Sequence, residues 1–224
     1  MISLVNEIPK INLPLAEVVK INCNYNLYKD IALFWVQDGD RAVTSMLDGN
    51  MVIYNRDADI EELREFINVI SPQSVFSDAV TLENLFDDNF YRVYVMKSEH
   101  NFVCDIQSDI VDSKGIYELL DVNGLELPLY EHFAVDFCHR LNHGHLKYFA
   151  LKDKCAAVVI SDGQAALLNG VASHQKGMGT VALYGVLSQF DMPCLAVCEN
   201  GVMPFYLKNN FNYIYDAGYW RKNP

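Results

Sequence analysis

The residues best suited to chemistry lie at 174–180, HQKGMGT, between an apolar strand pattern and a helix pattern. Gly177 and Gly179 stand where that helix must begin, and glycine lacks the Cβ that would keep a ligand away from the backbone. The first amides of a helix are unpaired donors at the positive end of the helix dipole. This segment therefore favours binding of an anion, most naturally a phosphate.

Two interpretations of these glycines remain open on the residues alone. Glycine pairs at helix starts also serve close packing without any ligand. The chain has no Gly-x4-Gly-Lys-Ser/Thr run and no full Gly-x-Gly-x-x-Gly fingerprint, so neither a P-loop nor a dinucleotide fold is indicated.

Histidines and cysteines offer a weaker case for chemistry. Cys194 and Cys198 share one face of the strand-like CLAVC but lack accompanying ligands, and His139 and His143 share a helix face without a third ligand at convincing spacing. A histidine-rich helix end is also favoured by the helix dipole. We expect no metal site, and we expect most cysteines to be small buried side chains.

Composition limits the classes of function. The chain has 224 residues, of which 51% are hydrophobic, enough for a sizeable core. No apolar run approaches a membrane span and no export signal opens the chain, so a soluble cytoplasmic protein is expected. The net charge of −12, with no cluster of lysine and arginine in the sequence, argues against nucleic acid as a partner.

The patterns around the glycine segment predict alternating strands and helices. An amphipathic helix with an acidic cap is predicted at 60–70, and a longer helix at 127–144 places Phe133, Phe137 and Leu141 on one side. A polar connector is expected at 98–115. Strands are predicted at 31–37, 41–47, 51–54, 71–78, 89–97, 146–152, 154–161, 164–173 and 194–198, and in the final aromatic stretch.

The chain also contains a candidate internal repeat. Residues 32–55 and 148–171 share the order strand, turn, strand, Asp-Gly turn, strand, and a helix follows each. The first copy has acidic residues at 57–63 where the second has HQKGMGT, and these would repel a phosphate. Three-strand meanders with Asp-Gly turns are common, so chance similarity is the alternative. We predict an N-terminal α/β half at 1–110 and a second domain at 111–224.

From Leu146 to Trp220 the chain resembles the GNAT family of acyl-CoA-dependent N-acetyltransferases. Three pieces carry the resemblance, in order: the strand ending at 170–172, the HQKGMG segment, and FYLKNNF at 205–211. The resemblance implies an α/β fold of the α+β type, with a mixed, mainly antiparallel sheet flanked by helices and opened near Val171. The first half would then be a degenerate copy in a tandem duplication.

The resemblance also implies a coenzyme A site. In the family, amides of the loop hold the pyrophosphate, and the free edge of the preceding strand pairs with pantetheine. His174 stands where the family usually has arginine or glutamine, and Lys176 could supply the missing positive charge. The residues implied to bind acetyl-CoA are Val171, Ala172, Ser173, His174, Gln175, Lys176, Gly177, Met178, Gly179 and Thr180.

Two residues are candidates for the proton transfers of acyl transfer. The resemblance makes Tyr206 the general acid, whereas the residues alone also fit a half-buried helix aromatic with a hydrogen-bonded hydroxyl. Glu199, directly after CLAVC, is the first candidate for the base, and a solvated residue before a helix is the other interpretation. A base relayed through water would also suffice.

The function implied is transfer of an acetyl or other acyl group from coenzyme A to a primary amine of a small or amino-acid-like acceptor. The alternative is a non-catalytic acyl-CoA-binding or sensor module. The expected partners are acyl-CoA and a small amine, with no nucleic acid and no membrane, and a homodimer is left open.

Overall fold

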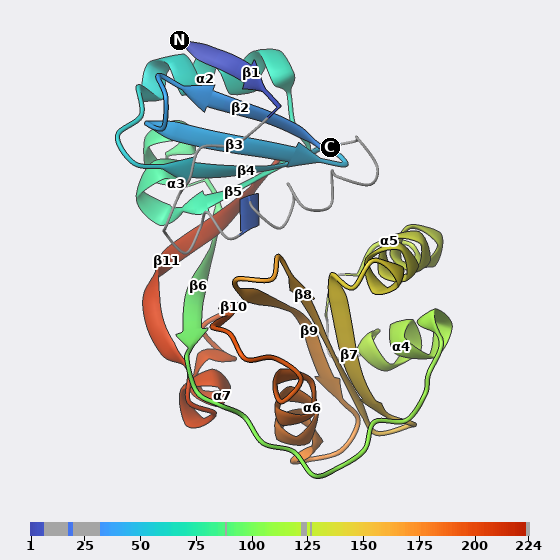
Figure 1. Ribbon diagram of the computed structural model, residues 1–224. Helices are drawn as coiled ribbons and strands as arrows, with labels where there is room; N and C mark the ends of the chain where they lie inside the picture. Colours follow the sequence, from blue (N-terminus) through green and yellow to red (C-terminus); the bar gives the residue numbers. More distant parts are fainter. Residues whose placement is uncertain (7–17, 20–31, 88, 122–124, 126, 223–224) are drawn as a thin grey trace. The chain divides into compact units, whose positions relative to one another are not determined.

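The computed structural model describes residues 1–6, 18–19, 32–87, 89–121, 125 and 127–222 (Figure 1). Within these residues no helix is both long and apolar enough to cross a membrane. The elements are β1 Ile2–Val5, β2 Leu33–Gln37, β3 Ala42–Leu47, β4 Asn50–Asn55, α2 Ile60–Ile70, β5 Ser74–Asp78, α3 Ala79–Phe86, β6 Tyr91–Ser98, α4 Ser113–Leu120, α5 Tyr130–Asn142, β7 Leu146–Leu151, β8 Cys155–Ser161, β9 Ala166–Ser173, α6 Met178–Leu187, β10 Cys194–Cys198, α7 Met203–Lys208 and β11 Asn212–Arg221.

The chain forms two compact units. Unit 1 comprises residues 1–96, 197–205 and 213–224, and unit 2 comprises 97–196 and 206–212. The last strand, β11, belongs to unit 1 because it pairs antiparallel with β5, from Ala217 opposite Asp78 to Arg221 opposite Ser74. The predicted boundary at residue 110 separates the two halves of the candidate repeat, not the two compact units. It remains a prediction.

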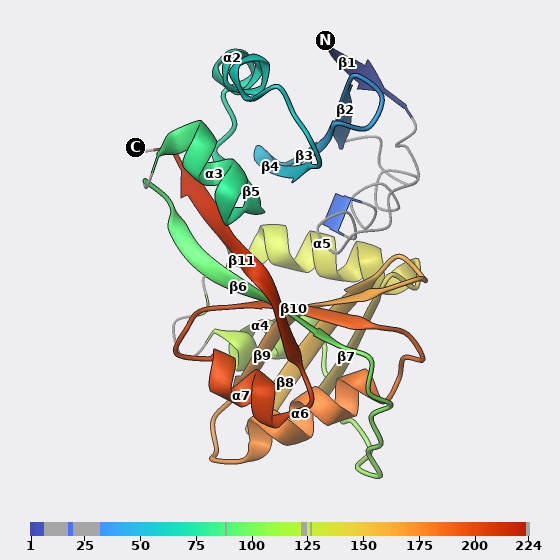
Figure 2. The same cartoon turned by 90° about the vertical axis from the view of Figure 1, so that its left-hand side faces the viewer.

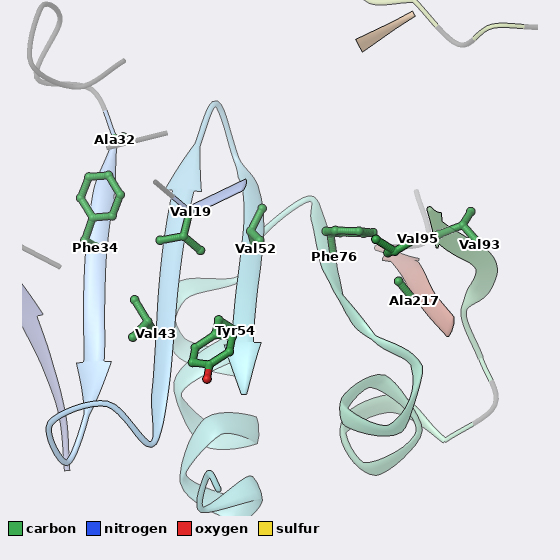
Figure 3. Packing of buried hydrophobic residues seen from close by; sticks show 10 residues of the cluster. All are labelled: Val19, Ala32, Phe34, Val43, Val52, Tyr54, Phe76, Val93, Val95 and Ala217. Carbon is green, nitrogen blue, oxygen red and sulfur yellow. The ribbon is translucent and has the colours of Figure 1, made fainter. Parts of the chain in front are cut away.

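Unit 1 contains strands in the order β1-β2-β3-β4-β5-β11-β6. Successive side chains of a strand point to opposite faces, so β4 supplies two hydrophobic clusters. Met51 and Ile53 pack with Leu63 of α2 and Leu82 of α3. On the other face, Val52 and Tyr54 pack with the residues of Figure 3, namely Val19, Ala32, Phe34, Val43, Phe76, Val93, Val95 and Ala217.

Unit 2 contains the strands β10-β9-β8-β7, with helices on both faces (Figure 2). Two adjacent residues of β7 show which helix covers which face of the sheet. The ring of Tyr148 lies 5.8 Å from that of Phe137 in α5, and Phe149 lies directly under Gly185 of α6. Because neighbouring strand residues face opposite ways, α5 and α6 cover opposite faces of the sheet.

The same order of elements occurs twice along the chain. We call β2-β3-β4-α2-β5-α3-β6 the first copy and β7-β8-β9-α6-β10-α7-β11 the second copy. In both, three antiparallel strands lead to a helix, and the next strand runs parallel to the third. Antiparallel pairs predominate overall, so the predicted mixed, mainly antiparallel sheet is confirmed, and the repeated order supports the tandem duplication.

One detail of the predicted core is wrong. Phe133 and Phe137 are buried, but Leu141 is 37% exposed and Arg140 is only 5% exposed in its place. On a helix with about 3.6 residues per turn, Arg140 lies nearer than Leu141 to the stripe set by Phe133 and Phe137, because each step of four residues rotates about 40° in the same direction. The Nε of Arg140 donates to both carboxylate oxygens of Asp136 at 3.0 Å, which compensates the buried charge.

Candidate functional site

Strand β9 has an edge that its parallel neighbour leaves open. In the described part of the chain, β10 pairs with β9 only at Ala166 and Leu167, although β9 continues to Ser173. On its other side β9 stays paired with β8 as far as Ser173 opposite Cys155, with a register shift that leaves Asn169 as an extra, exposed residue. The backbone of β9 beyond Leu167 can therefore accept an extended ligand, as predicted near Val171.

The connection from β9 to α6 is the glycine segment. Gly177 caps the helix with φ 86° and ψ −18°, in the left-handed region, where a residue with a Cβ is strained. No side chain caps the first turn, and no acidic residue lies in it. A Cβ built at Gly177 would meet no atom within 4 Å. Beyond the amide of Met178, which donates to the carbonyl of Gln175, the first turn of α6 thus has backbone amides without a side-chain cap, beside a glycine whose Cβ position is open.

Hydrogen bonds fix the shape of this connection. The amide of His174 donates to the carbonyl of Lys154 at 2.7 Å, and the amide of Met178 donates to the carbonyl of Gln175 at 3.1 Å. These bonds turn the chain from the strand into the helix. The side chains at 174–177 are exposed, those at 178–180 are half-buried, and Ala172 is buried in the sheet. The ten predicted binding residues thus form one continuous surface segment, from the open edge of β9 to the start of α6.

Tyr206 is buried, with 7% of its surface exposed. Its ring meets Phe211 edge-on at 5.3 Å, and Phe211 lies 6.2 Å from Phe102. Phe102 in turn contacts Tyr184 of α6 at 5.1 Å. An aromatic cluster therefore connects Tyr206 to the helix that begins at the glycine segment.

Asn210 lies in the turn between α7 and β11. It adopts φ 64°, in the left-handed region that asparagine tolerates better than most residues. Its Nδ2 donates to the hydroxyl of Tyr184 at 3.4 Å, which ties the end of α7 to α6. Asparagine is therefore compatible with the local backbone.

Glu199 belongs to unit 1, in the turn between β10 and α7. Its side chain is exposed, and its carbonyl accepts hydrogen bonds from the amides of Val202 at 3.0 Å and Met203 at 3.1 Å. These bonds fix the turn, while the carboxylate stays accessible to solvent.

In the first copy, the equivalent opening is bridged by side chains. β5 pairs with β4 at Asn50, Met51 and Val52, and beyond them the hydroxyl of Ser77 donates to the carbonyl of Ile53 at 2.8 Å. The Nδ2 of Asn55, the last residue of β4, donates to the hydroxyl of Thr81 at 2.9 Å. Ser77 and Thr81 are both buried. The position that is open in the second copy is thus closed by hydrogen bonds in the first.

The helix start of the first copy is also occupied by its own chain. Asp59 accepts a hydrogen bond from the amide of Glu62 at 3.2 Å. The buried Gln37 accepts from the amide of Asp59 at 2.7 Å and donates to the carboxylate of Glu62 at 2.8 Å. The connections 56–59 and 174–177 have the same length, but only the second leaves its amides uncapped by a carboxylate.

Three buried cysteines, Cys155, Cys194 and Cys198, do not add a reactive group to the site. Burial raises the pKa of the Cys194 thiol to about 12 and also raises that of Cys155. Burial, with the nearby charge of Glu199, raises the pKa of Cys198 to about 11. A thiol with a raised pKa is a poor nucleophile at neutral pH. Across the described residues, no group of three or more His, Cys, Asp or Glu is arranged to hold a metal.

Sequence reasoning missed several residues that define these two regions. The strand pattern gives no sign that Asn169 interrupts the β8–β9 register. Gln37 and Ser77 sit in apolar strand patterns, where a polar residue signals a buried hydrogen-bonding role. Lys154 is distant in sequence from His174, and only the β8–β9 pairing brings it there.

Comparisons with known proteins find structural rather than sequence similarity. No protein-family model matches the chain, and no curated protein matches its sequence significantly. A conserved protein of unknown function from Staphylococcus epidermidis superposes with a TM-score of 0.55 at 11% identity, covering 82% of this chain and 91% of its own.

Two further structures carry a family description. A GCN5-related N-acetyltransferase from Sphaerobacter thermophilus matches with a TM-score of 0.56 at 12% identity, over 86% of this chain and 80% of its own. A tandem GNAT protein from the clavulanic acid biosynthesis pathway matches with a TM-score of 0.54 at 10% identity, over 100% and 99% of the two chains. Together with the repeated order of elements, these matches show that the chain has the fold of the GCN5-related N-acetyltransferases, with a tandem GNAT protein among its structural neighbours.

Proposed function

We propose that the protein is an acyl-CoA-dependent N-acyltransferase, which moves an acetyl or other acyl group from coenzyme A to a primary amine of a small or amino-acid-like acceptor. One observation carries the proposal: the uncapped, glycine-bearing start of α6 directly follows a strand whose edge is open beyond Leu167. The GNAT fold supports it, because a diphosphate and an extended pantetheine chain need such a pair of features.

The residues present fit coenzyme A in two places. The amides of 175–180, other than that of Met178, would hold the pyrophosphate, since Gly177 leaves space for close approach. The backbone of Val171 and Ala172, just before Ser173, would pair with the amides of pantetheine as an added strand does. His174 and Lys176 are exposed beside the first of these places.

Acyl transfer needs two proton movements. The amine nitrogen attacks the thioester carbonyl, a C–N bond forms, the C–S bond breaks, and the nitrogen loses a proton. In our proposal Tyr206 donates a proton to the departing thiolate, and Glu199, directly or through water, accepts the proton of the amine. Holding the amine and the thioester together would supply much of the rate.

Purified protein mixed with acetyl-CoA and a panel of primary amines tests the proposal through release of free thiol. We expect Tyr206→Phe to lower kcat at least tenfold while the Kd for CoA changes less than twofold. Tyr117→Phe is the matched control, because its hydroxyl donates to the carbonyl of Pro128 in the α4–α5 region, at 3.1 Å, away from the glycine segment in sequence. Equal loss of turnover and of CoA binding in Tyr206→Phe would point to a packing role instead.

A binding module that senses acyl-CoA is the second candidate. It is favoured by the burial of Tyr206 and by the absence of a carboxylate on β9. Saturable CoA binding without thiol release across a broad panel of amines would support this second function and contradict the first.

A further inference from the structure

Strand β7 is the last strand of the sheet in unit 2, so its outer edge has no strand neighbour among the described residues. Its inner edge pairs antiparallel with β8, from Leu146 opposite Ile160 to Leu151 opposite Cys155. An edge strand presents a row of amides and carbonyls that can pair with a strand of another molecule. The outer edge of β7 is therefore a surface at which two copies of the chain could associate.

Two residues of the connector before α4, Ser108 and Asp109, occupy this outer edge. The amide of Ala150 donates to the hydroxyl of Ser108 at 3.0 Å, and the carbonyl of Ala150 accepts from the amide of Asp109 at 2.8 Å. The amide of Lys152, just after β7, donates to the carboxylate of Asp109 at 2.8 Å. Ser108 and Asp109 thus bind three successive backbone groups of the outer edge, and we call these two residues the edge cap.

The residue Gln189, which follows α6, engages the same edge. Its Nε2 donates to the carbonyl of Tyr148 at 3.0 Å, and its carbonyl accepts from the ammonium group of Lys147 at 2.5 Å. A lysine on an edge strand also disfavours pairing with another molecule. The outer edge of β7 is thus bound by groups from two other segments of unit 2 between Tyr148 and Lys152.

The first copy has a strand at the equivalent edge. β2 takes the place in the first copy that β7 takes in the second, and β2 pairs with β1 from Ile2 opposite Gln37 to Val5 opposite Phe34. In the second copy the edge cap stands where that strand would be. The side chain of Asp109 is exposed, so hydrogen bonds rather than buried apolar surface hold it. Segments with few buried apolar contacts are among the first to open.

We propose that the edge cap prevents self-association, by keeping β7 of one molecule from pairing with β7 of a second copy. Two identical strands related by a two-fold axis pair antiparallel, and each would use the backbone groups that the edge cap now binds. The amide and carbonyl of Ala150 already lie where they can form hydrogen bonds, so loss of the edge cap would leave them ready for such a partner. The proposal goes beyond the proposed function, because it involves neither coenzyme A nor the glycine segment.

The double variant Ser108→Ala/Asp109→Pro tests the proposal, because it removes the hydroxyl, the amide hydrogen and the carboxylate of the edge cap together. In sedimentation velocity the variant should form dimers, with an association at least about tenfold tighter than any shown by the wild type. Ser108→Thr/Asp109→Asn is the matched control. It keeps a hydroxyl, an amide and an oxygen acceptor at the same positions, so it should behave as the wild type does. Equal association of the double variant and the wild type would overturn the proposal.

Amide hydrogen exchange identifies the edge at which the double variant associates. At low protein concentration the amide of Ala150 should exchange at least about tenfold faster than in the wild type, because its acceptor is gone. Protection should return as the concentration rises and dimers form. The amide of Phe149 is the internal control, because alternate residues of a strand direct their backbone groups to opposite edges, and it should stay protected by β8 throughout.

A dimer that leaves the amide of Ala150 unprotected would place the contact elsewhere and contradict the proposal. Loss of protection at Phe149 would mean that the double variant has disturbed the β7–β8 pairing. Ser108→Ala alone, which removes one hydroxyl, then decides the matter. It should show the same concentration-dependent protection of Ala150 to a smaller degree, and its absence in a folded Ser108→Ala protein would also contradict the proposal.

Discussion

The hydroxyl of Ser77 donates a 2.8 Å hydrogen bond to the carbonyl of Ile53 and so joins β5 to β4 where the equivalent strands of the second copy part. Both residues are completely buried. This bond and the acidic start of α2 distinguish the first copy from the second copy, which carries the candidate site. The two copies thus differ at this equivalent position, which is open in the second copy and closed in the first.

Removal of this bond should destabilise unit 1. Ser77→Ala leaves the buried carbonyl of Ile53 without the hydroxyl, which should lower the free energy of unfolding by about 1–3 kcal/mol. Chemical denaturation measures the change. Ser188→Ala, which removes an exposed serine hydroxyl bonded to the carbonyl of Gly185, should cost less than about 0.5 kcal/mol. Equal effects of the two variants would contradict the closed arrangement of the first copy.

The position of α6 depends on the absence of a side chain at Gly185. A Cβ there would lie 2.2 Å from the ring of Phe149. Gly185→Ala should therefore destabilise the protein by about 1–3 kcal/mol, measured as a loss of unfolding free energy. Gly201→Ala, where a Cβ meets nothing within 4 Å, should be nearly neutral.

A second substitution checks that the clash is the cause. Adding Phe149→Leu to Gly185→Ala should cost less than the sum of the two single changes, because the smaller side chain leaves room for the new methyl group. Strict additivity would mean that α6 is not held against β7 through this contact.

Burial of the Cys194 thiol predicts how stability depends on pH. Its pKa is raised from 9.0 to about 12, so between these pH values the folded protein keeps a proton that the unfolded chain has lost. The contribution of this group is present below pH 9 and is lost as pH rises toward 12. The melting temperature of the wild type should therefore fall more steeply above pH 9 than that of Cys194→Ala. Parallel curves for the two proteins would contradict a buried, protonated thiol.

Local patterns were sufficient to predict most of the elements. Alternating apolar residues and Asp-Gly turns predicted β2, β3 and β4 and their repeat in β7, β8 and β9, because both signals depend on neighbours in sequence. The helix that begins after Gly177 was predicted for the same reason. Asp48 and Gly49 have φ values of 50° and 76°, as a tight turn between antiparallel strands requires.

Features that depend on distant residues were not predictable in this way. Nothing near Asn212 indicates that β11 pairs with β5, because a pairing partner more than 130 residues earlier leaves no mark on local periodicity. The opening beside Val171 was predicted only through the resemblance to a known family. Arg140 rather than Leu141 is buried, because its ion pair with Asp136 compensates its charge. The closure of the first copy by Ser77 likewise depends on a contact between two strands.

Titration of coenzyme A into the wild type, Gly177→Ala and Gly163→Ala tests the central claim most directly. Gly177 and Gly163 share a left-handed φ, 86° and 87°, and neither has a neighbour within 4 Å of an added Cβ, so alanine strains both equally. Only Gly177 lies at the start of α6. We predict saturable binding with one CoA per chain for the wild type and Gly163→Ala, and at least tenfold weaker binding for Gly177→Ala. Equal affinities of the two variants, two sites per chain, or no binding by the folded wild type would contradict the account.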